Sequence, residues 1–144
     1  MRTLFALIAF VLIGNAVSFP EAVAADYKRV EPLVTTTETI VGEKLSYPTT
    51  GQAEIRSLIV TMQPGEETGW HTHGVPTYGY VLSGTLIVDY GDKGERTYRP
   101  GTGFMEAMAV KHNGRNPGAE PVRILVVFMG AEEAKSVVRQ GENQ

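Results

Sequence analysis

The chain has 144 residues, a length that suits one domain, and its 13 basic and 16 acidic residues give a formal net charge of −3. The sequence contains no cysteine, which excludes disulfides, thiolate ligands and cysteine nucleophiles within it. Its basic residues are scattered, so we exclude a nucleic-acid partner, because a phosphate backbone is bound by clustered Lys and Arg side chains.

Residues 1–25 have the pattern of a secretory signal peptide. A basic residue near the start is followed by an apolar run from Leu4 to Gly14 and by small residues before Asp26. A membrane-spanning helix needs about 20 consecutive apolar residues, more than this run provides. We therefore expect cleavage after Ala24 or Ala25 and a periplasmic or secreted domain with no stable membrane insertion. An uncleaved membrane anchor is the alternative.

Residues 26–52 are predicted to form an N-terminal arm. The segment from Tyr27 to Ile40 contains many β-branched residues, which favour strands. We expect one or two early strands here, in a position where they are available to pack on a partner subunit.

Glycine turns divide residues 53–130 into many short strands. The clearest strand runs from Glu54 to Met62, and both its faces are apolar over its second half, so we expect it to be central in its sheet or covered on both sides. Further strands are expected over Tyr78–Ser83, Thr85–Tyr90, Arg96–Arg99 and Val122–Met129. Many short strands with almost no helix predict an all-β sandwich or barrel.

Residues 131–144 are predicted to form a C-terminal tail. The composition from Ala131 to Lys135 favours a helix, and the residues from Gly141 are expected to be disordered.

The three histidines of the chain lie in two glycine-bounded stretches. His71 and His73 are two residues apart, so on a strand both imidazoles point to the same face. His112 lies in the second stretch. Neutral imidazoles are common ligands of divalent transition metals, so the three side chains can hold one ion. The alternative for the first pair is two polar positions on a solvated strand face.

The spacing of glycine, histidine and asparagine around these residues resembles the two sequence motifs of the cupin superfamily. The matching positions are Gly65, His71, His73 and Gly84 in the first motif and Gly101, His112 and Asn116 in the second, where Ala107 and Ala109 replace a proline and a glycine. The resemblance covers residues 53–129. It implies a double-stranded β-helix, or jelly-roll, barrel, with a metal inside its mouth and a small-molecule ligand in the barrel. Members of this superfamily commonly form homodimers, which we also expect here.

The resemblance implies that His71, His73 and His112 hold one divalent first-row transition metal: iron, manganese, nickel, zinc or copper. The glutamate that completes the ligand set in the family is absent, because Thr77 occupies its position. We hypothesise that Glu106, from the second motif, is a metal ligand or a base instead. A solvent-facing position is the alternative for this side chain.

Tyr78 and Tyr80 are further candidates for proton transfer near the metal. Three imidazoles leave coordination positions open, which suits chemistry on a carbonyl or enolate, or with oxygen. Cupins include dioxygenases, decarboxylases, isomerases, lyases and proteins that bind without turnover. We favour a metal-dependent, oxygenase-like enzyme acting on a small oxygenated molecule such as a phenol, an enol or an organic acid. The alternative is a periplasmic module that binds or senses a metal or small molecule without turnover.

Overall fold

The computed structural model describes residues 29–139, so the predicted signal peptide and the end of the tail from Gly141 lie outside the described residues. The chain divides into two units, 1–31 and 32–144. In the first unit only residues 29–31 are described, and they are exposed and outside any regular secondary structure. All the strands named below belong to the second unit.

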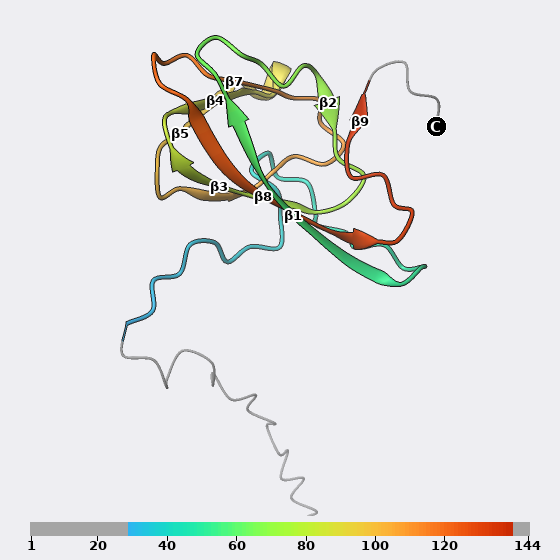
Figure 1. Cartoon of the computed structure of the whole chain (residues 1–144). Coiled ribbons are helices and arrows are strands. Elements are labelled where there is room, and N and C mark those ends of the chain that lie inside the picture. The colour runs from blue at the N-terminus through green and yellow to red at the C-terminus, as the bar shows by residue number, and fades with distance from the viewer. Residues whose placement is uncertain (1–28, 140–144) are drawn as a thin grey trace, which may run out of the picture. The chain divides into compact units, whose positions relative to one another are not determined.

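Almost all the regular secondary structure in the described part of the second unit is β-strand (Figure 1). In chain order they are β1 (Ala53–Met62), β2 (His71–Thr72), β3 (Thr77–Ser83), β4 (Leu86–Asp89), β5 (Glu95–Tyr98), β6 (Gly103–Met105), β7 (Asn113–Arg115), β8 (Val122–Ala131) and β9 (Val138–Arg139). A single 3-10 turn, η1 (Gly91–Lys93), joins β4 to β5. The described residues contain no α-helix, which confirms the predicted all-β fold.

The strands form three sheets, and most connections pass from one sheet to another. The largest sheet has the order β1–β8–β3–β6, a second has the order β5–β4–β7, and β2 pairs with β9. All strand pairs are antiparallel, and β8 lies between β1 and β3 along its length (Figure 1). Strands that follow each other in the chain, such as β3 and β4, therefore lie in different sheets, as in a jelly-roll barrel.

The hydrophobic core joins residues of the two larger sheets. Along β4, Leu86 and Val88 are buried while Ile87 and Asp89 are partly exposed, which is the two-residue period of a strand with one face inward. The buried cluster consists of Met62, Val81, Leu86, Val88, Tyr90, Tyr98, Phe104, Ala107, Val122 and Ile124.

Gly79 makes room for the ring of Phe104 on the neighbouring strand. The two residues are opposite each other in the β3–β6 register, and a Cβ atom at position 79 would lie 2.5 Å from the Phe104 ring. One face of that ring stacks on Tyr98, with ring centroids 3.9 Å apart. This packing holds the Phe104 side chain in place in the interior.

The prediction that the first long strand is central in its sheet or covered on both sides is wrong. Strand β1 is an edge of the four-stranded sheet, with only β8 beside it. Its side chains Ile55 and Ile59 are 66% and 50% exposed. Apolar residues on both faces of a strand thus determine neither whether both faces are covered nor whether a second strand pairs with its backbone.

Two further predictions at the ends of the domain are corrected. Residues 32–52 contain no strand, only an isolated bridge between Glu38 and Lys44. The segment from Ala131 to Lys135 is not a helix: β8 continues through Ala131, and the chain then turns at Glu133, whose φ of 67° is incompatible with a right-handed helix. The chain then enters β9, next to β2.

Candidate metal centre

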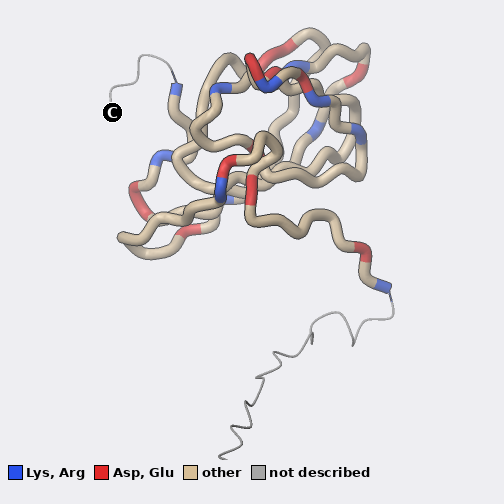
Figure 2. The backbone as a smooth tube through the Cα atoms, turned by 180° about the vertical axis from the view of Figure 1, so that it is seen from behind, with Lys and Arg blue, Asp and Glu red and all other residues tan. Residues whose placement is uncertain are grey.

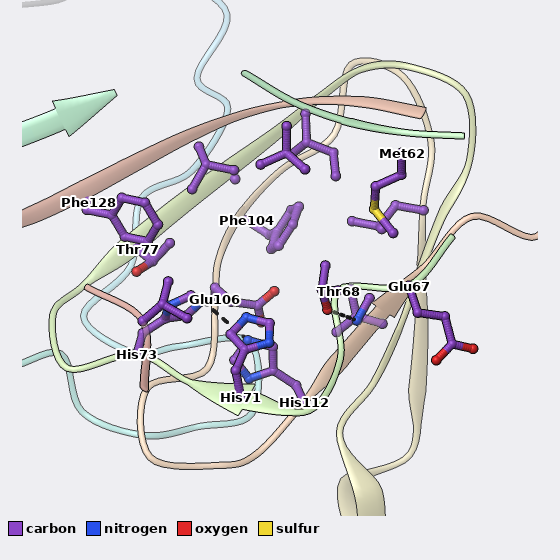
Figure 3. Close-up of a pocket in the computed structure, with 18 of the residues that line it drawn as sticks. Met62, Glu67, Thr68, His71, His73, Thr77, Phe104, Glu106, His112 and Phe128 are labelled. Atoms are coloured by element: carbon purple, nitrogen blue, oxygen red, sulfur yellow. Dashed lines mark hydrogen bonds between the residues drawn. The ribbon is translucent and has the colours of Figure 1, made fainter. Parts of the chain in front are cut away.

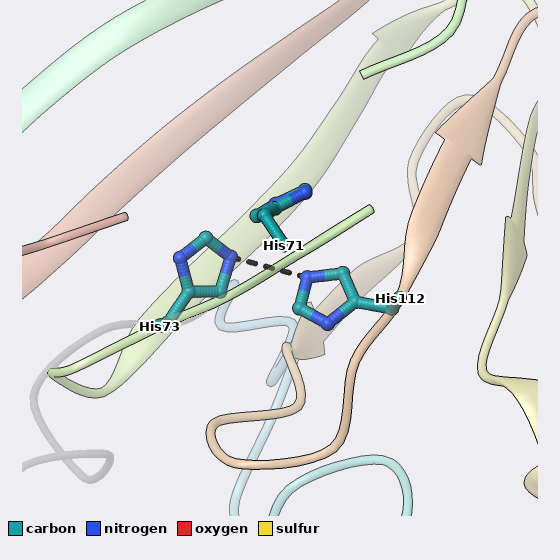
Figure 4. Close-up of side chains that lie close together, drawn as sticks. All are labelled: His71, His73 and His112. Carbon is teal, nitrogen blue, oxygen red and sulfur yellow. Dashed lines mark hydrogen bonds between the residues drawn. The ribbon is translucent and has the colours of Figure 1, made fainter. Parts of the chain in front are cut away.

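Backbone pairing between the two histidine stretches brings His71, His73 and His112 together. His71 and His112 exchange two backbone hydrogen bonds, each of 3.0 Å, and the His73 N–H donates to the carbonyl of Met108. All three side chains are buried. One ring nitrogen from each lies within 4.8 Å of the others, and the rings converge on one point (Figure 4).

Each histidine ring is oriented by a backbone carbonyl at its Nδ1 atom. The Nδ1–O distances are 2.8 Å from His71 to Gly69, 2.9 Å from His73 to Ser136, and 2.9 Å from His112 to Val110. A carbonyl only accepts hydrogen bonds, so each Nδ1 carries the proton. In a neutral imidazole the lone pair is then on Nε2, and hydrogen bonds of this kind orient histidine ligands in metalloproteins.

The three imidazoles are neutral over the physiological pH range. Burial lowers the pKa of His71 and of His112, and it lowers the pKa of His73 to about 3. The Nε2 atoms of His73 and His112 lie 3.3 Å apart (Figure 4). Because both rings carry their proton on Nδ1, two lone pairs face each other in a buried place. A cation bound to the Nε2 atoms removes this conflict, so the donor set fits a divalent transition metal.

Glu106 is buried and lines the same cavity as the histidines (Figure 3). The alternative of a surface position is therefore wrong. Its Oε1 atom accepts a hydrogen bond of 2.8 Å from the Ala107 N–H. Burial raises the pKa of Glu106 to about 7, while hydrogen bonds from Tyr90 and Ala107 act in the opposite direction. Whether this carboxylate binds the metal stays a prediction.

The structure does not bring Tyr78 and Tyr80 to the metal centre. On β3 the cavity is lined by Thr77 and Gly79, and the two tyrosines alternate with them along the strand. Tyr78 instead lines a shallow groove on the opposite face, together with Met105. A direct role of these tyrosines in proton transfer at the metal is therefore corrected: they lie on the wrong face of β3.

Sequence analysis missed a buried tyrosine pair beside Glu106. The Tyr90 hydroxyl lies 2.8 Å from the Tyr98 hydroxyl and is hydrogen-bonded to Glu106. Its ring centroid is 5.8 Å from that of His112. A signal was present in the sequence, because Tyr90 continues the alternation of the inward-facing residues Leu86 and Val88.

The cavity in front of the histidines has a volume of about 360 Å³, with polar groups at one end and mainly apolar walls (Figure 3). The apolar walls include Met62, Leu86, Phe104, Ile124, Val126 and Phe128. Among the lining residues the only lysine or arginine is Arg139, which donates a hydrogen bond of 2.8 Å to the carbonyl of Thr68. The arrangement suits a small molecule with an apolar body and a polar group that faces the histidines.

Comparisons with known proteins agree with the fold. Residues 58–128 match the family model described as the Cupin domain. Oxalate decarboxylase from Lactobacillus farciminis, solved as a formate complex, is 26% identical with a TM-score of 0.50; the alignment covers 60% of this chain and 26% of that chain. These findings support the cupin superfamily and confirm the predicted cupin jelly-roll fold.

Two further solved structures are similar. Oxalate decarboxylase from Bacillus subtilis is 29% identical with a TM-score of 0.48, and 58% of this chain and 23% of that chain are covered. A cupin-2 domain protein from Shewanella frigidimarina is 21% identical with a TM-score of 0.46, and the coverage is 52% and 70%. The chain thus spans about a quarter of the length of the oxalate decarboxylases. No curated protein sequence matches it.

A nucleic-acid partner would need a basic region on the described residues, and a membrane partner would need a helix that could span the membrane. Lys and Arg alternate with Asp and Glu along the backbone, without a separate basic region (Figure 2). Within residues 29–139, no helix has the length and apolar character needed to cross a membrane.

Proposed function

From the cupin domain match and the cupin-fold neighbours, we propose that this protein is a metal-dependent enzyme acting on a small oxygenated organic molecule, with oxygenase-like chemistry as the first candidate. The observation that carries the proposal is the group of three histidines, each anchored at Nδ1, that line a mainly apolar cavity. Bound there, a divalent ion would polarise an oxygen of the substrate or bring the substrate and dioxygen together.

In this proposal, the residues around the cavity have three different roles. His71, His73 and His112 would hold the ion through their Nε2 atoms, which the Nδ1 hydrogen bonds leave free. Glu106 would act as a fourth ligand or as a base. Its pKa of about 7 places it near the operating pH of a proton acceptor. Tyr90 would orient the Glu106 carboxylate through its hydroxyl.

The cavity walls favour a substrate larger and less charged than a small dicarboxylate. The volume of about 360 Å³ exceeds what a few-atom acid fills, and most of the wall is apolar. A phenol or enol fits this environment, since its oxygen can face the histidines while the ring or chain contacts Phe104 and Phe128. Because the chain is similar to an oxalate decarboxylase, organic acids should be tested beside phenols and enols.

The test is to load the full chain with iron, manganese, nickel, zinc or copper and to incubate each form with phenols, enols and organic acids. Oxygen consumption and the mass of the products are measured, with Tyr78→Phe as the control that leaves the cavity unchanged and Glu106→Gln as the impaired variant. We expect turnover of an apolar phenol or enol in at least one metal form. Binding and release of every ligand unchanged would contradict the enzyme and support a binding or sensing module. One observation favours that alternative: the predicted tyrosine acid–base groups lie on the other face of β3.

We also propose that the protein forms a homodimer. The support comes from strand β1 and not from the N-terminal segment that the sequence pointed to. The outer face of β1 exposes Ile55 and Ile59, and the backbone of this edge strand lacks a second strand partner within the described residues. A second copy of the chain would cover both. Light scattering at micromolar concentration should give twice the chain mass, and Ile59→Lys should give a monomer. A monomeric native chain would contradict the proposal.

We further propose that the protein is exported and cleaved. The support is the composition of residues 1–25, with an apolar run that ends at Gly14 and small residues before Asp26. Mass spectrometry of the exported protein should find a new N-terminus at Ala25 or Asp26. An intact Met1 on membrane-bound protein would contradict export with cleavage.

A further inference from the structure

Residues 39–43 form a tight turn against the end of β6. The Thr39 N–H donates to the Glu43 carbonyl (2.8 Å) and the Gly42 N–H to the Thr39 carbonyl (3.0 Å). Gly42 has a φ of 85°, which favours glycine at this position. The Ile40 N–H donates to the carbonyl of Met105 (2.8 Å), so the turn is tied to the strand that leads to Glu106.

The Glu43 carboxylate accepts hydrogen bonds from three consecutive backbone N–H groups of the loop before His112. Oε2 accepts from Met108 (2.7 Å), and Oε1 accepts from Ala109 (2.8 Å) and Val110 (2.9 Å). The Thr39 hydroxyl is 3.2 Å from Oε2 and itself accepts from the Glu43 N–H. Successive N–H groups that converge on one anion form a concave anion site, and here the anion is a side chain of the same protein.

The loop held by Glu43 carries the groups that orient two of the three histidines. The Val110 carbonyl accepts from Nδ1 of His112, and the Met108 carbonyl accepts from the backbone N–H of His73. Two of the three residues whose N–H groups bind the Glu43 carboxylate, Met108 and Val110, thus have carbonyls that position the metal ligands. A shift of this loop would move both Nε2 atoms relative to His71.

From these contacts, and resting on the metal site proposed above, we propose that Glu43 is a positioning residue of the metal centre. Its carboxylate fixes the conformation of residues 107–111, and thereby the backbone position of His73 and the ring orientation of His112. In the resemblance described above, this loop carries Ala107 and Ala109 where the motif has a proline and a glycine. A loop without that proline has more conformational freedom, and Glu43 restricts it from outside.

The charge of Glu43 also acts on the site. The Glu43 carboxylate is bound to the N–H of Val110, two residues before His112, so its negative charge lies close to the metal site. A divalent ion among three neutral imidazoles has no charge compensation from its ligands, and a nearby carboxylate provides part of it.

The test compares Glu43→Ala and Glu43→Gln with Glu38→Ala in the full chain. Glu38 lies on the same segment, its side chain is 43% exposed, and its carboxylate forms an ion pair with the exposed Lys44. Zn²⁺ affinity is measured by competition with a chelator, and unfolding of the metal-free proteins is followed in parallel. We expect Glu43→Ala to weaken Zn²⁺ binding at least about 10-fold, Glu43→Gln to weaken it less, and Glu38→Ala to leave it unchanged.

A second readout separates failure of this inference from failure of the metal site. In the metal-free protein, 15N NMR reports the tautomer of the His112 ring and the exchange protection of the Ala109 and Val110 N–H groups. We expect the native chain to hold the Nδ1–H form and Glu43→Ala to give a tautomer mixture with unprotected amides. If the native chain binds no Zn²⁺, the metal proposal fails, and this readout alone decides the role of Glu43.

Two results would overturn the inference. One is a folded Glu43→Ala variant with native Zn²⁺ affinity, native His112 tautomer and protected loop amides. The other is unfolding of both Glu43 variants, which would assign the residue to the stability of the whole fold and not to the site.

Discussion

The backbone N–H of Glu106 donates a hydrogen bond of 2.8 Å to the carbonyl of Thr77. The residue that replaces the expected glutamate of the first cupin motif and the buried glutamate of the second motif are therefore direct neighbours on adjacent segments. Both line the cavity in front of the histidines. A carboxylate missing from β3 is thus present on the segment beside it, where it can face the same ion.

Because Thr77 and Glu106 are neighbours, we predict that a carboxylate at position 77 can replace the one at position 106. Glu106→Gln removes the charge and should weaken metal binding about 10-fold, as for other residues that support metal sites. The double variant Thr77→Glu/Glu106→Gln returns a carboxylate to β3 and should recover part of that affinity. Chelator competition measures both. The idea fails if Glu106→Gln binds metal like the native chain, or if the double variant binds no better than the single one.

Removal of the Tyr90 hydroxyl should affect both stability and the site. Tyr90→Phe leaves the buried Tyr98 hydroxyl and Glu106 each without one partner, which costs about 1–3 kcal/mol in the free energy of unfolding. The matched control is Tyr78→Phe, on the opposite face of β3, which should change neither stability nor metal affinity noticeably. Denaturant unfolding of both variants checks this. Equal effects of the two substitutions would contradict the assignment of Tyr90 to the Glu106 network.

Acidification should destabilise the metal-free protein. A histidine in the unfolded chain titrates near pH 6.5, whereas burial lowers the pKa of His71 and His112 in the folded chain and brings that of His73 to about 3. Below about pH 6.5 the unfolded chain therefore binds protons that the folded chain does not, and the free energy of unfolding falls as the pH falls toward 3.

Glu106 acts in the opposite direction over part of this range. Burial raises its pKa to about 7, so between pH 4.5 and 7 the folded chain holds a proton that the unfolded chain releases, and this contribution to stability is lost as the pH rises. Three histidines outweigh one glutamate, and Glu106→Gln should make the acid destabilisation steeper. Unfolding curves from pH 8 to pH 4 test this. A metal-free protein that becomes more stable on acidification would contradict the buried, neutral state of the histidines.

A methyl group at Gly79 should disturb the cavity wall. In Gly79→Ala the new Cβ would lie 2.5 Å from the Phe104 ring, which is also stacked on Tyr98, so we expect a loss of about 1–3 kcal/mol in the free energy of unfolding. Gly118→Ala is the control, since its Cβ would have no neighbour closer than 3.4 Å. Thermal unfolding compares the two. Equal stability of both variants would refute the close packing of Phe104 on β3.

The motif spacing was sufficient to identify the three histidines, and the reason is physical. A two-residue spacing places His71 and His73 on the same side of an extended chain. The motif as a whole then encodes which second segment pairs with the first, as the backbone bridge between His71 and His112 shows. The all-β fold was equally predictable, because glycine turns divide the chain into short, apolar strands.

Other features depend on pairings that no local pattern encodes. The edge position of β1 follows from the order of strands in the sheet, which the alternation of its own residues does not determine. Glu43 lies far from the motifs in the sequence, and its contacts with the loop before His112 arise only in the folded chain. Tyr90 was within reach of sequence reasoning, since it shares the inward face of Leu86 and Val88.

The central claim is that His71, His73 and His112 together hold one divalent transition metal. Its most direct test is the metal content of the full chain purified without chelators, measured by mass spectrometry of the elements, beside the three single His→Ala variants and Tyr78→Phe as the control. We expect about one equivalent of a first-row metal in the native chain and in the control, and a sharp loss in each histidine variant with the fold retained. A native chain that takes up no metal, or a histidine variant that keeps a full equivalent, would contradict the account.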